Sequence, residues 1–432
     1  MQVFTNDLCH LKDVMRVPIC TAYPQETAFC VLETGRLDVT CSGTGSAGGD
    51  APIFGFGERN NPRRSFLFVS RVLGRHIPVS PGRMRAAFTR MADTIPADLP
   101  GPVLMTGMAE TAVGLGAGVH DAWIARTGRA DTVFLSTTRA RLDGPLLTTF
   151  REEHSHASNH LVHLPQHRAD LDLLRGARTL VMVDDEASSG NTFRNLAAGL
   201  VSAGLDRIAH VHTVVLTDWS GPAGDRLLPD HPRISVTRGA LVQGSYRWTP
   251  ATGAPVRRLP DADLLRQGTF CPIRRDDDAR LGRSARSATV MPAGLSEAIG
   301  TAPARLLVIG TGEHVWEPFL LAETLERMGH HVRFGATTRS PILPGHAIRR
   351  GHVFGDHEGL GITNYLYNVD PTTEDRIILC ADTDLTAIDP ALLSALGADV
   401  VVGSVFHHRR DLAGLTRGVA PATGFILKDA QG

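Results

Sequence analysis

The sequence predicts an α/β fold in which a parallel sheet flanked by helices is followed by a second α/β domain. Apolar runs at residues 102–106, 131–135 and 180–183 have the length and aliphatic content of buried parallel strands. The first and third run into small-residue loops and then into helical patterns, as strand–helix repeats do. A similar succession begins again near residue 303. We therefore expect two α/β units in one chain.

Composition limits the class of protein. A chain of 432 residues, 42% of them hydrophobic, can bury two or three domain cores. A net charge of −1 offers no basic surface for nucleic acid or an anionic membrane, so neither is an expected partner. Residues 1–7 lack a basic stretch before an apolar core, and no apolar window reaches membrane-spanning length, which predicts a cytoplasmic protein. The six cysteines form no C-x-x-C pair, and we interpret them as reduced thiols.

Paired carboxylates end the apolar run at 180–183. Asp184 and Asp185 precede a loop of small residues, and a helical pattern starts at Phe193. A loop at a helix N-terminus directs backbone N–H groups toward a phosphate, with help from the helix dipole. Carboxylates accept hydrogen bonds from hydroxyl groups but repel phosphoryl oxygens, so the acids suit the vicinal hydroxyls of a ribose. The predicted phosphate loop comprises Ala187, Ser188, Ser189, Gly190, Asn191 and Thr192.

This arrangement of strand, two acids, small-residue loop and helix resembles the PRPP-binding signature of type I phosphoribosyltransferases. A Walker A loop would need a lysine after its glycine, and the G-x-G-x-x-G fingerprint is absent from this loop. The resemblance implies the type I phosphoribosyltransferase fold with a small hood, and PRPP and pyrophosphate as ligands. It also implies Mg²⁺, held at Asp184 and Asp185 largely through PRPP, and a homodimer.

The resemblance assigns pyrophosphate binding to the loop after the first strand, through its backbone amides. Glu110 is unusual in such a loop. Two interpretations stay open, because it could bind Mg²⁺, a water or an amine, or cap the following helix within its first turn. The loop consists of Gly107, Met108, Ala109, Glu110 and Thr111.

A long polar segment follows the strand at 131–135, where orotate-type enzymes have a mobile catalytic loop that excludes water. Arg139 is the candidate that stabilises the charge of leaving pyrophosphate, and Arg141 is a weaker one. Solvated loop arginines are the alternative for both. Glu153 and His154 are candidates for acid–base catalysis or for contact with the base. Histidines with i, i+4 spacing leave a zinc site open, although HExxH order is absent.

Two further segments supply weaker candidates. Residues 63–79 combine an aromatic strand with cations, as the hood of orotate-type enzymes does, and this points to Arg71, Arg75 and His76 near the base and pyrophosphate. Trp219 ends a buried strand, where it could stack on a base or pack in the core.

From residue 303 the chain repeats the order of the first unit. We interpret this as a degenerate second copy of the fold that has lost its phosphate loop, with chance similarity of α/β units as the alternative. The paired segments are residues 107–110 and 310–313, 136–139 and 336–339, 159–162 and 364–367, and the two-acid strand and 377–384.

The residues Thr338-Arg339-Ser340-Pro341 extend the resemblance. With the PRPP signature, they resemble bacterial phosphoribosyltransferases with a C-terminal TRSP domain, encoded in tellurium-resistance gene clusters. In the second domain, Gly312, Glu313 and Arg339 could bind a further ligand, or the domain could serve as a structural lid. The expected domains are a hood segment at 1–90, a phosphoribosyltransferase core at 91–250, a connector at 251–302 and a TRSP-type α/β domain at 303–432.

The expected function follows from these resemblances. It is a PRPP-dependent transferase that joins ribose 5-phosphate to a nucleobase-like acceptor and releases pyrophosphate, or that runs in reverse from a ribonucleotide. A PRPP or nucleotide sensor without turnover is the alternative. The retained pyrophosphate loop favours the enzyme, whereas the family's loop lysine has no counterpart here, which favours the sensor.

Overall fold

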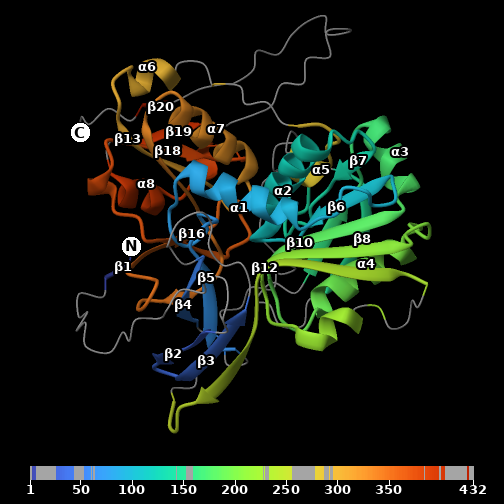
Figure 1. The fold of residues 1–432 in the computed structure, drawn as a ribbon. Helices are drawn as coiled ribbons and strands as arrows, with labels where there is room; N and C mark the ends of the chain where they lie inside the picture. Colours follow the sequence, from blue (N-terminus) through green and yellow to red (C-terminus); the bar gives the residue numbers. More distant parts are fainter. Residues whose placement is uncertain are drawn as a thin grey trace, which may run out of the picture.

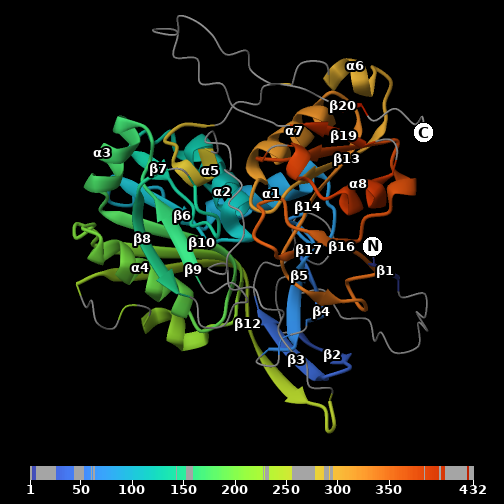
Figure 2. The same cartoon turned by 180° about the vertical axis from the view of Figure 1, so that it is seen from behind.

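The computed structural model consists of two α/β units joined by small antiparallel sheets (Figure 1). Both views place the unit with β6, β7 and β10 beside the unit with β13 and β18, and the helices α1, α2 and α7 lie between them (Figure 2). The structure describes residues 2–5, 26–42, 53–59, 61, 64–142, 144–151, 159–226, 228, 233–254, 278–286, 291, 295–383, 385–397, 400–403 and 426–427.

The first unit has a seven-stranded sheet of order β2-β3-β12-β11-β10-β6-β7. The strands from β12 to β7 are parallel, and β2 and β3 form an antiparallel hairpin. The long strand β12 pairs with β11 through its first half and with β3 through its second half. The bounds are β2 Glu26–Leu32, β3 Gly35–Ser42, β6 Val103–Gly107, β7 Thr132–Phe134, β10 Thr179–Ala187, β11 His210–Asp218 and β12 Ser235–Pro250.

Helices cover the parallel part of this sheet. α1 (Pro81–Asp93) starts with a proline at a position where no backbone N–H is needed, and it packs on α2 (Ala112–Thr127). α2 covers β6 and β10 and ends at Gly128. α3 (Arg168–Gly176) lies against β6 and β7, and α4 (Asn191–Ser202) follows the predicted phosphate loop. The predicted parallel sheet flanked by helices is therefore confirmed.

The second unit has the strand order β14-β13-β18-β19-β20. This order matches β7-β6-β10-β11-β12 of the first unit, except that β20 is antiparallel to its neighbour. α7 covers β13 and β14, and α8 lies against β16. The bounds are β13 Arg305–Gly310, α7 Trp316–Arg327, β14 His331–Ala336, β18 Arg376–Cys380, α8 Pro390–Leu396, β19 Val400–Gly403 and β20 Ile426–Leu427.

Small sheets connect or flank the two units. The hood sheet consists of β4 (Phe54–Arg59), β5 (Phe66–Ser70) and β15 (Ile342–Leu343), so it takes a strand from the second unit. The other sheets are β1 (Gln2–Thr5) with β16 (Arg350–Gly355) and β17 (Thr363–Tyr367), and β8 (Leu146–Arg151) with β9 (Asn159–His163). Among the described residues, no helix has both the length and the apolar character needed to cross a bilayer.

The repeat has a register that differs from the predicted one by one residue. Thr138 pairs with Leu161, and Thr338 pairs with Tyr365 in the same antiparallel manner. Asn364 therefore occupies the place of His160, not that of Asn159. The sequence comparison aligned two asparagines, but the hydrogen-bonded partner fixes the register.

Candidate functional site

The acid pair lies where the parallel strand β10 ends. Val183 is fully buried, whereas Asp184 and Asp185 are half-buried at the carboxyl end of the sheet. The loop then turns into α4 at Gly190, which has a φ of 74°, a left-handed conformation that glycine adopts without strain. The acids and the N-terminus of α4 thus frame one end of the sheet, where ligands bind in open parallel sheets.

Charge accumulates at this strand end. Asp184 accepts a hydrogen bond from the amide of Asp185 at 2.9 Å. Burial, and then the neighbouring Glu186, raise the pKa of Asp185 above its usual value. Glu186 itself forms an ion pair with Arg64 at 2.5 Å. Sequence reasoning missed Glu186 and Arg64, although the third acid directly follows the pair and Arg64 lies in the predicted hood.

The predicted pyrophosphate loop is beside the acid pair. The amide of Met108 donates to the carbonyl oxygen of Val183 at 3.0 Å, and the amide of Ala109 donates to Oγ1 of Thr137 at 2.8 Å. The peptide bond between Ala109 and Glu110 is cis. This loop therefore faces the ends of β10 and β7 at once.

Glu110 does not cap α2, so that interpretation was wrong. The helix starts after it, and its first turn contains no acid. The carboxylate instead lies 3.4 Å from the guanidinium of Arg75 and accepts a 3.4 Å hydrogen bond from the amide of Arg339. Burial raises the pKa of Glu110, but Arg75 and Arg339 outweigh it, so the pKa is lowered overall.

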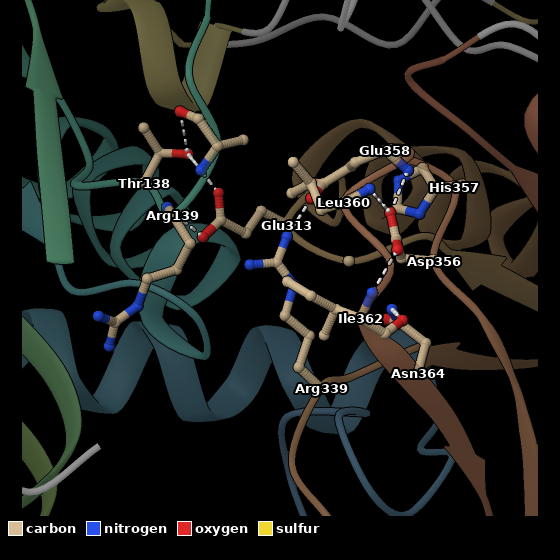
Figure 3. Close-up of polar contacts among 12 residues, drawn as sticks. Thr138, Arg139, Glu313, Arg339, Asp356, His357, Glu358, Leu360, Ile362 and Asn364 are labelled. Carbon is tan, nitrogen blue, oxygen red and sulfur yellow. Dashed lines mark hydrogen bonds and ion pairs between the residues drawn. The ribbon is translucent and has the colours of Figure 1, made fainter. Parts of the chain in front are cut away.

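Arg139 is buried at the turn after β7. Its Nη1 donates to the carbonyl oxygen of Asn159 at 3.1 Å, and its backbone amide donates to Glu313 of the second unit at 2.8 Å (Figure 3). The neighbouring Arg141 is exposed. The structure therefore brings only the first of the two predicted arginines into the contact region between the units.

The histidine-rich segment is described only in part. Glu153 and His154 lie outside the described residues. His160 stacks on Phe150 with ring centroids 4.5 Å apart and bonds to Thr137, and His163 bonds to the backbone of Leu142 and Gly144. Within the described parts of the chain, no three histidine, cysteine or acidic side chains gather as metal ligands would.

The hood residues have different surroundings. Arg75 is buried and donates to the carbonyl oxygens of Glu110 at 2.7 Å, Gly312 at 2.5 Å and Thr337 at 2.7 Å. Burial, and then Arg75, lower the pKa of His76 to about 3, so its ring is neutral. Arg71 is exposed. Of the three, only Arg75 joins the pyrophosphate loop to the second unit.

A pocket lies between the hood sheet and the acid pair. Its cavity volume is about 10 Å³, room for about one water molecule, and it is partly open to solvent. Trp219 supports this pocket from behind, because its ring stacks on Phe68 with centroids 4.5 Å apart. Core packing was one of its two predicted roles. The lining residues are Ile53, Phe54, Phe68, Ser70, Asp185, Glu186, Leu216 and Thr217, of which the sequence singled out only Asp185.

The candidates of the second unit are buried among opposite charges. Arg339 forms an ion pair with Glu358, and both side chains are buried (Figure 3). Gly312 adjoins His357, and Glu313 lies 3.8 Å from Arg280. Ion pairs therefore engage both Arg339 and Glu313.

The acid pair is a candidate site for Mg²⁺. Carboxylate oxygens are the hard ligands that Mg²⁺ prefers, and Asp185 has no cation paired directly with it among the hydrogen bonds and ion pairs of the described residues. Two carboxylates suit a cation that takes its remaining ligands from substrate phosphates and water.

The parallel sheet with flanking helices has the fold expected of a type I phosphoribosyltransferase. Residues 53–245 match the family described as phosphoribosyl transferase, and residues 275–396 match the TRSP domain, described as C-terminal to it. The two matches follow each other in the expected order, a phosphoribosyl transferase part and then a TRSP domain.

Several solved structures resemble part of the chain. Adenine phosphoribosyltransferase from Rhodothermus marinus has 14% identity over 37% of this chain and 80% of its own, with a TM-score of 0.24. The Trypanosoma brucei enzyme, in complex with AMP, pyrophosphate and ribose-5-phosphate, has 13% identity over 44% and 76%, with a TM-score of 0.30. Orotate phosphoribosyltransferase from Aeropyrum pernix has 14% identity over 41% and 80%, with a TM-score of 0.24. No curated protein matches the sequence.

Proposed function

We propose that this enzyme transfers the phosphoribosyl group of PRPP to a ring nitrogen of a nucleobase-like acceptor and releases pyrophosphate, or catalyses the reverse reaction. The main support is the position of the acid pair beside the predicted pyrophosphate loop. The carbonyl oxygen of Val183, directly before Asp184, accepts the amide of Met108 at 3.0 Å. Groups for the ribose and for pyrophosphate are thus adjacent.

Each part of PRPP has a matching group in this arrangement. The 5-phosphate would bind the backbone amides of residues 187–192 at the start of α4. The ribose hydroxyls would donate to Asp184 and Asp185. Pyrophosphate would lie against the loop at residues 107–111, where the amides of Met108 and Ala109 already have partners, with Arg139 as the nearby cation.

In the transfer step, the bond between the anomeric carbon and the pyrophosphate oxygen breaks, and a bond from that carbon to the acceptor nitrogen forms. The acceptor nitrogen gives its proton to water, and pyrophosphate leaves with the bonding electron pair. Positive charge develops on the sugar and negative charge on pyrophosphate. Arg139 and the loop would act by positioning pyrophosphate and by stabilising its leaving charge.

Bound Mg²⁺ would neutralise part of the charge on PRPP. Asp184 and Asp185 are the residues that would hold it, largely through substrate oxygens. Burial and Glu186 raise the pKa of Asp185. A nearby cation or hydroxyl donor would act in the opposite direction and favour its charged form.

The residues around the small pocket under the hood sheet have the chemistry that a planar, hydrogen-bond-donating acceptor would need. Phe54 and Phe68 supply aromatic surface, and Asp185 and Glu186 supply carboxylate oxygens at its edge. A heterocycle with N–H groups would match both.

Calorimetry with PRPP-Mg²⁺, followed by pyrophosphate release across a panel of nucleobases, tests this function. The comparison is between the native protein and the variant Asp184→Asn/Asp185→Asn. Binding lost in the variant, together with release for one acceptor class, would support the transferase. Tight binding without release from any acceptor would favour the sensor instead.

A further inference from the structure

In each unit, a glutamate in the loop after one strand contacts the turn after the neighbouring strand of the other unit. Glu313 of the second unit accepts hydrogen bonds from the hydroxyl of Thr138 and, at 2.8 Å, from the amide of Arg139 in the first unit (Figure 3). Glu110 of the first unit accepts a 3.4 Å hydrogen bond from the amide of Arg339 in the second, and the neighbouring Thr338 helps to lower the pKa of Glu110. Reciprocal contacts of this kind are the mark of a two-fold interface.

The framework behind each turn is also the same. The amide of Ala109 donates to Thr137 at 2.8 Å, and the amide of Gly312 donates to Thr337 at 2.8 Å. A Cβ atom on Gly107 would lie 2.2 Å from a backbone oxygen, and one on Gly310 would lie 2.3 Å from another, so both strands need glycine at their ends. The similarity therefore extends from strand order to individual hydrogen bonds.

Two chain segments outside the sheets also make reciprocal contacts with the two units. Val79, just before α1, forms an antiparallel bridge with Phe334 at the edge strand of the second unit. Arg283, between the units in sequence, forms one with Phe134 at the edge strand of the first unit. The edge strand of each unit is thus bridged by a segment that comes before the other unit in the chain.

Among the described residues at the two equivalent strand ends, only the first unit keeps an acid that can reach a ligand. Asp185 lies two residues after the carbonyl that accepts the loop amide, and Asp382 occupies the equivalent place in the second unit. Asp382 is bound by Arg280 at 2.5 Å and by His357 at 3.2 Å, and all three side chains are buried. Internal ion pairs therefore fill the place where the first unit offers a free carboxylate.

We propose that Glu313 is a positioning residue for the phosphoribosyltransferase site, acting across the interface between the units to fix the turn at Thr138 and Arg139. This inference rests on the proposed function, because that function places Arg139 next to pyrophosphate. The second unit then supplies, within one chain, the contact that a second subunit would supply in a two-fold dimer.

The surroundings of Glu313 suit a fixed anchor. Its side chain is 3% exposed, and both carboxylate oxygens are used, one by Thr138 and one by Arg139. Arg280 and Arg339 face it from the second unit and its connector, and Glu358 opposes them. Burial raises the pKa of Glu313 despite these arginines, since the site is closed to water.

The test compares Glu313→Ala and Glu313→Gln in the full chain. Glutamine keeps the size, an acceptor for the Arg139 amide and a polar partner for Thr138, whereas alanine keeps none of these. Glu323→Ala is the matched control, because Glu323 also pairs across the interface, with Arg85 at 2.7 Å, but far from the turn. The readouts are kcat and KM for PRPP in pyrophosphate release, and hydrogen exchange of the backbone at residues 137–140.

The expected result for Glu313→Ala is a loss of about tenfold or more in kcat/KM with faster exchange at residues 137–140. The kcat/KM of Glu313→Gln should stay within about threefold of the native value, and that of Glu323→Ala should equal the native value. Equal activity in Glu313→Ala and Glu323→Ala would overturn the proposal. If the native protein releases no pyrophosphate, the proposed function fails. Hydrogen exchange at residues 137–140 then tests the role of Glu313 by itself. Faster exchange confined to the turn then supports the anchor, and unchanged exchange overturns it.

Discussion

The guanidinium of Arg75 donates to the carbonyl oxygen of Gly312 at 2.5 Å, although 237 positions separate them in the sequence. The same group reaches the backbone oxygens of Glu110 and Thr337. One buried cation therefore ties the predicted pyrophosphate loop of the first unit to the equivalent loop of the second. Buried arginine suits this place because its planar fork can serve several oxygens at once.

Replacement of Arg75 should destabilise the fold. Arg75→Ala leaves the Glu110 carboxylate without one of its two cations, and removal of one partner of a buried ion pair typically costs about 3–5 kcal/mol. Urea-induced unfolding measures the change. Arg168→Ala is the control, because this arginine is 81% exposed and its helical pair with Asp172 contributes about 0.5 kcal/mol at most. Equal losses in both variants would contradict the assigned role of Arg75.

Substitution of Gly190 should weaken phosphate binding beyond its effect on stability. Gly190→Ala places a Cβ on a residue with a φ of 74°, at a cost of about 1 kcal/mol, and distorts the loop that leads into α4. Gly204→Ala imposes similar strain at a φ of 98°, beyond the other end of α4, with no atom close to the added carbon. Both variants should unfold at similar urea concentrations, but only Gly190→Ala should lose PRPP affinity, by about tenfold or more. Comparable affinity in the two variants would count against the loop.

The buried pair of His357 and Asp382 predicts a pH-dependent stability. Burial lowers the pKa of His357, but the hydrogen bond and charge of Asp382, with Glu358, outweigh burial and the opposing Arg339, so the pKa is raised. The stabilisation is therefore complete below about pH 6.5, the usual value for histidine, and is lost as the pH rises through the folded-state pKa.

Thermal unfolding of the native protein and His357→Gln at pH 6 and pH 9 tests this. The difference between the two proteins should be about 1–3 kcal/mol at pH 6 and smaller at pH 9. His331→Gln, at an exposed site on β14, should stay within about 0.5 kcal/mol of the native protein at both pH values. A difference for His357→Gln that is the same at both pH values would show that its protonation does not matter.

Local patterns explain why the core of the fold could be predicted from the sequence. Each predicted strand of the first sheet is a short aliphatic run, and the acids and the glycine loop directly follow one of them. Phosphate loops depend on residues that are neighbours in sequence, so residues 184–192 already contain most of the information. The same applies to the repeat, because Thr337 and Gly310 keep the roles of Thr137 and Gly107.

Contacts between distant segments could not be predicted in this way. Nothing near Glu110 in the sequence indicates that its partners would be Arg75 and Arg339. The pocket takes Phe54 and Phe68 from the hood sheet and Glu186 from β10, and only the folded chain brings these together. Long-range pairing also decided the register of Asn364, where matching letters suggested a different one.

The most direct test of the central claim is a calorimetric titration of PRPP-Mg²⁺ into the full chain and into Asp184→Asn/Asp185→Asn. We expect one PRPP per chain, because Asp382 is closed off by Arg280 and His357 in the second unit. We expect binding to weaken by about a hundredfold in the variant, because it removes both carboxylates that would hold the ribose hydroxyls and Mg²⁺. Absence of binding to the native protein, or equal binding to the variant, would contradict the assignment of this strand end as the PRPP site.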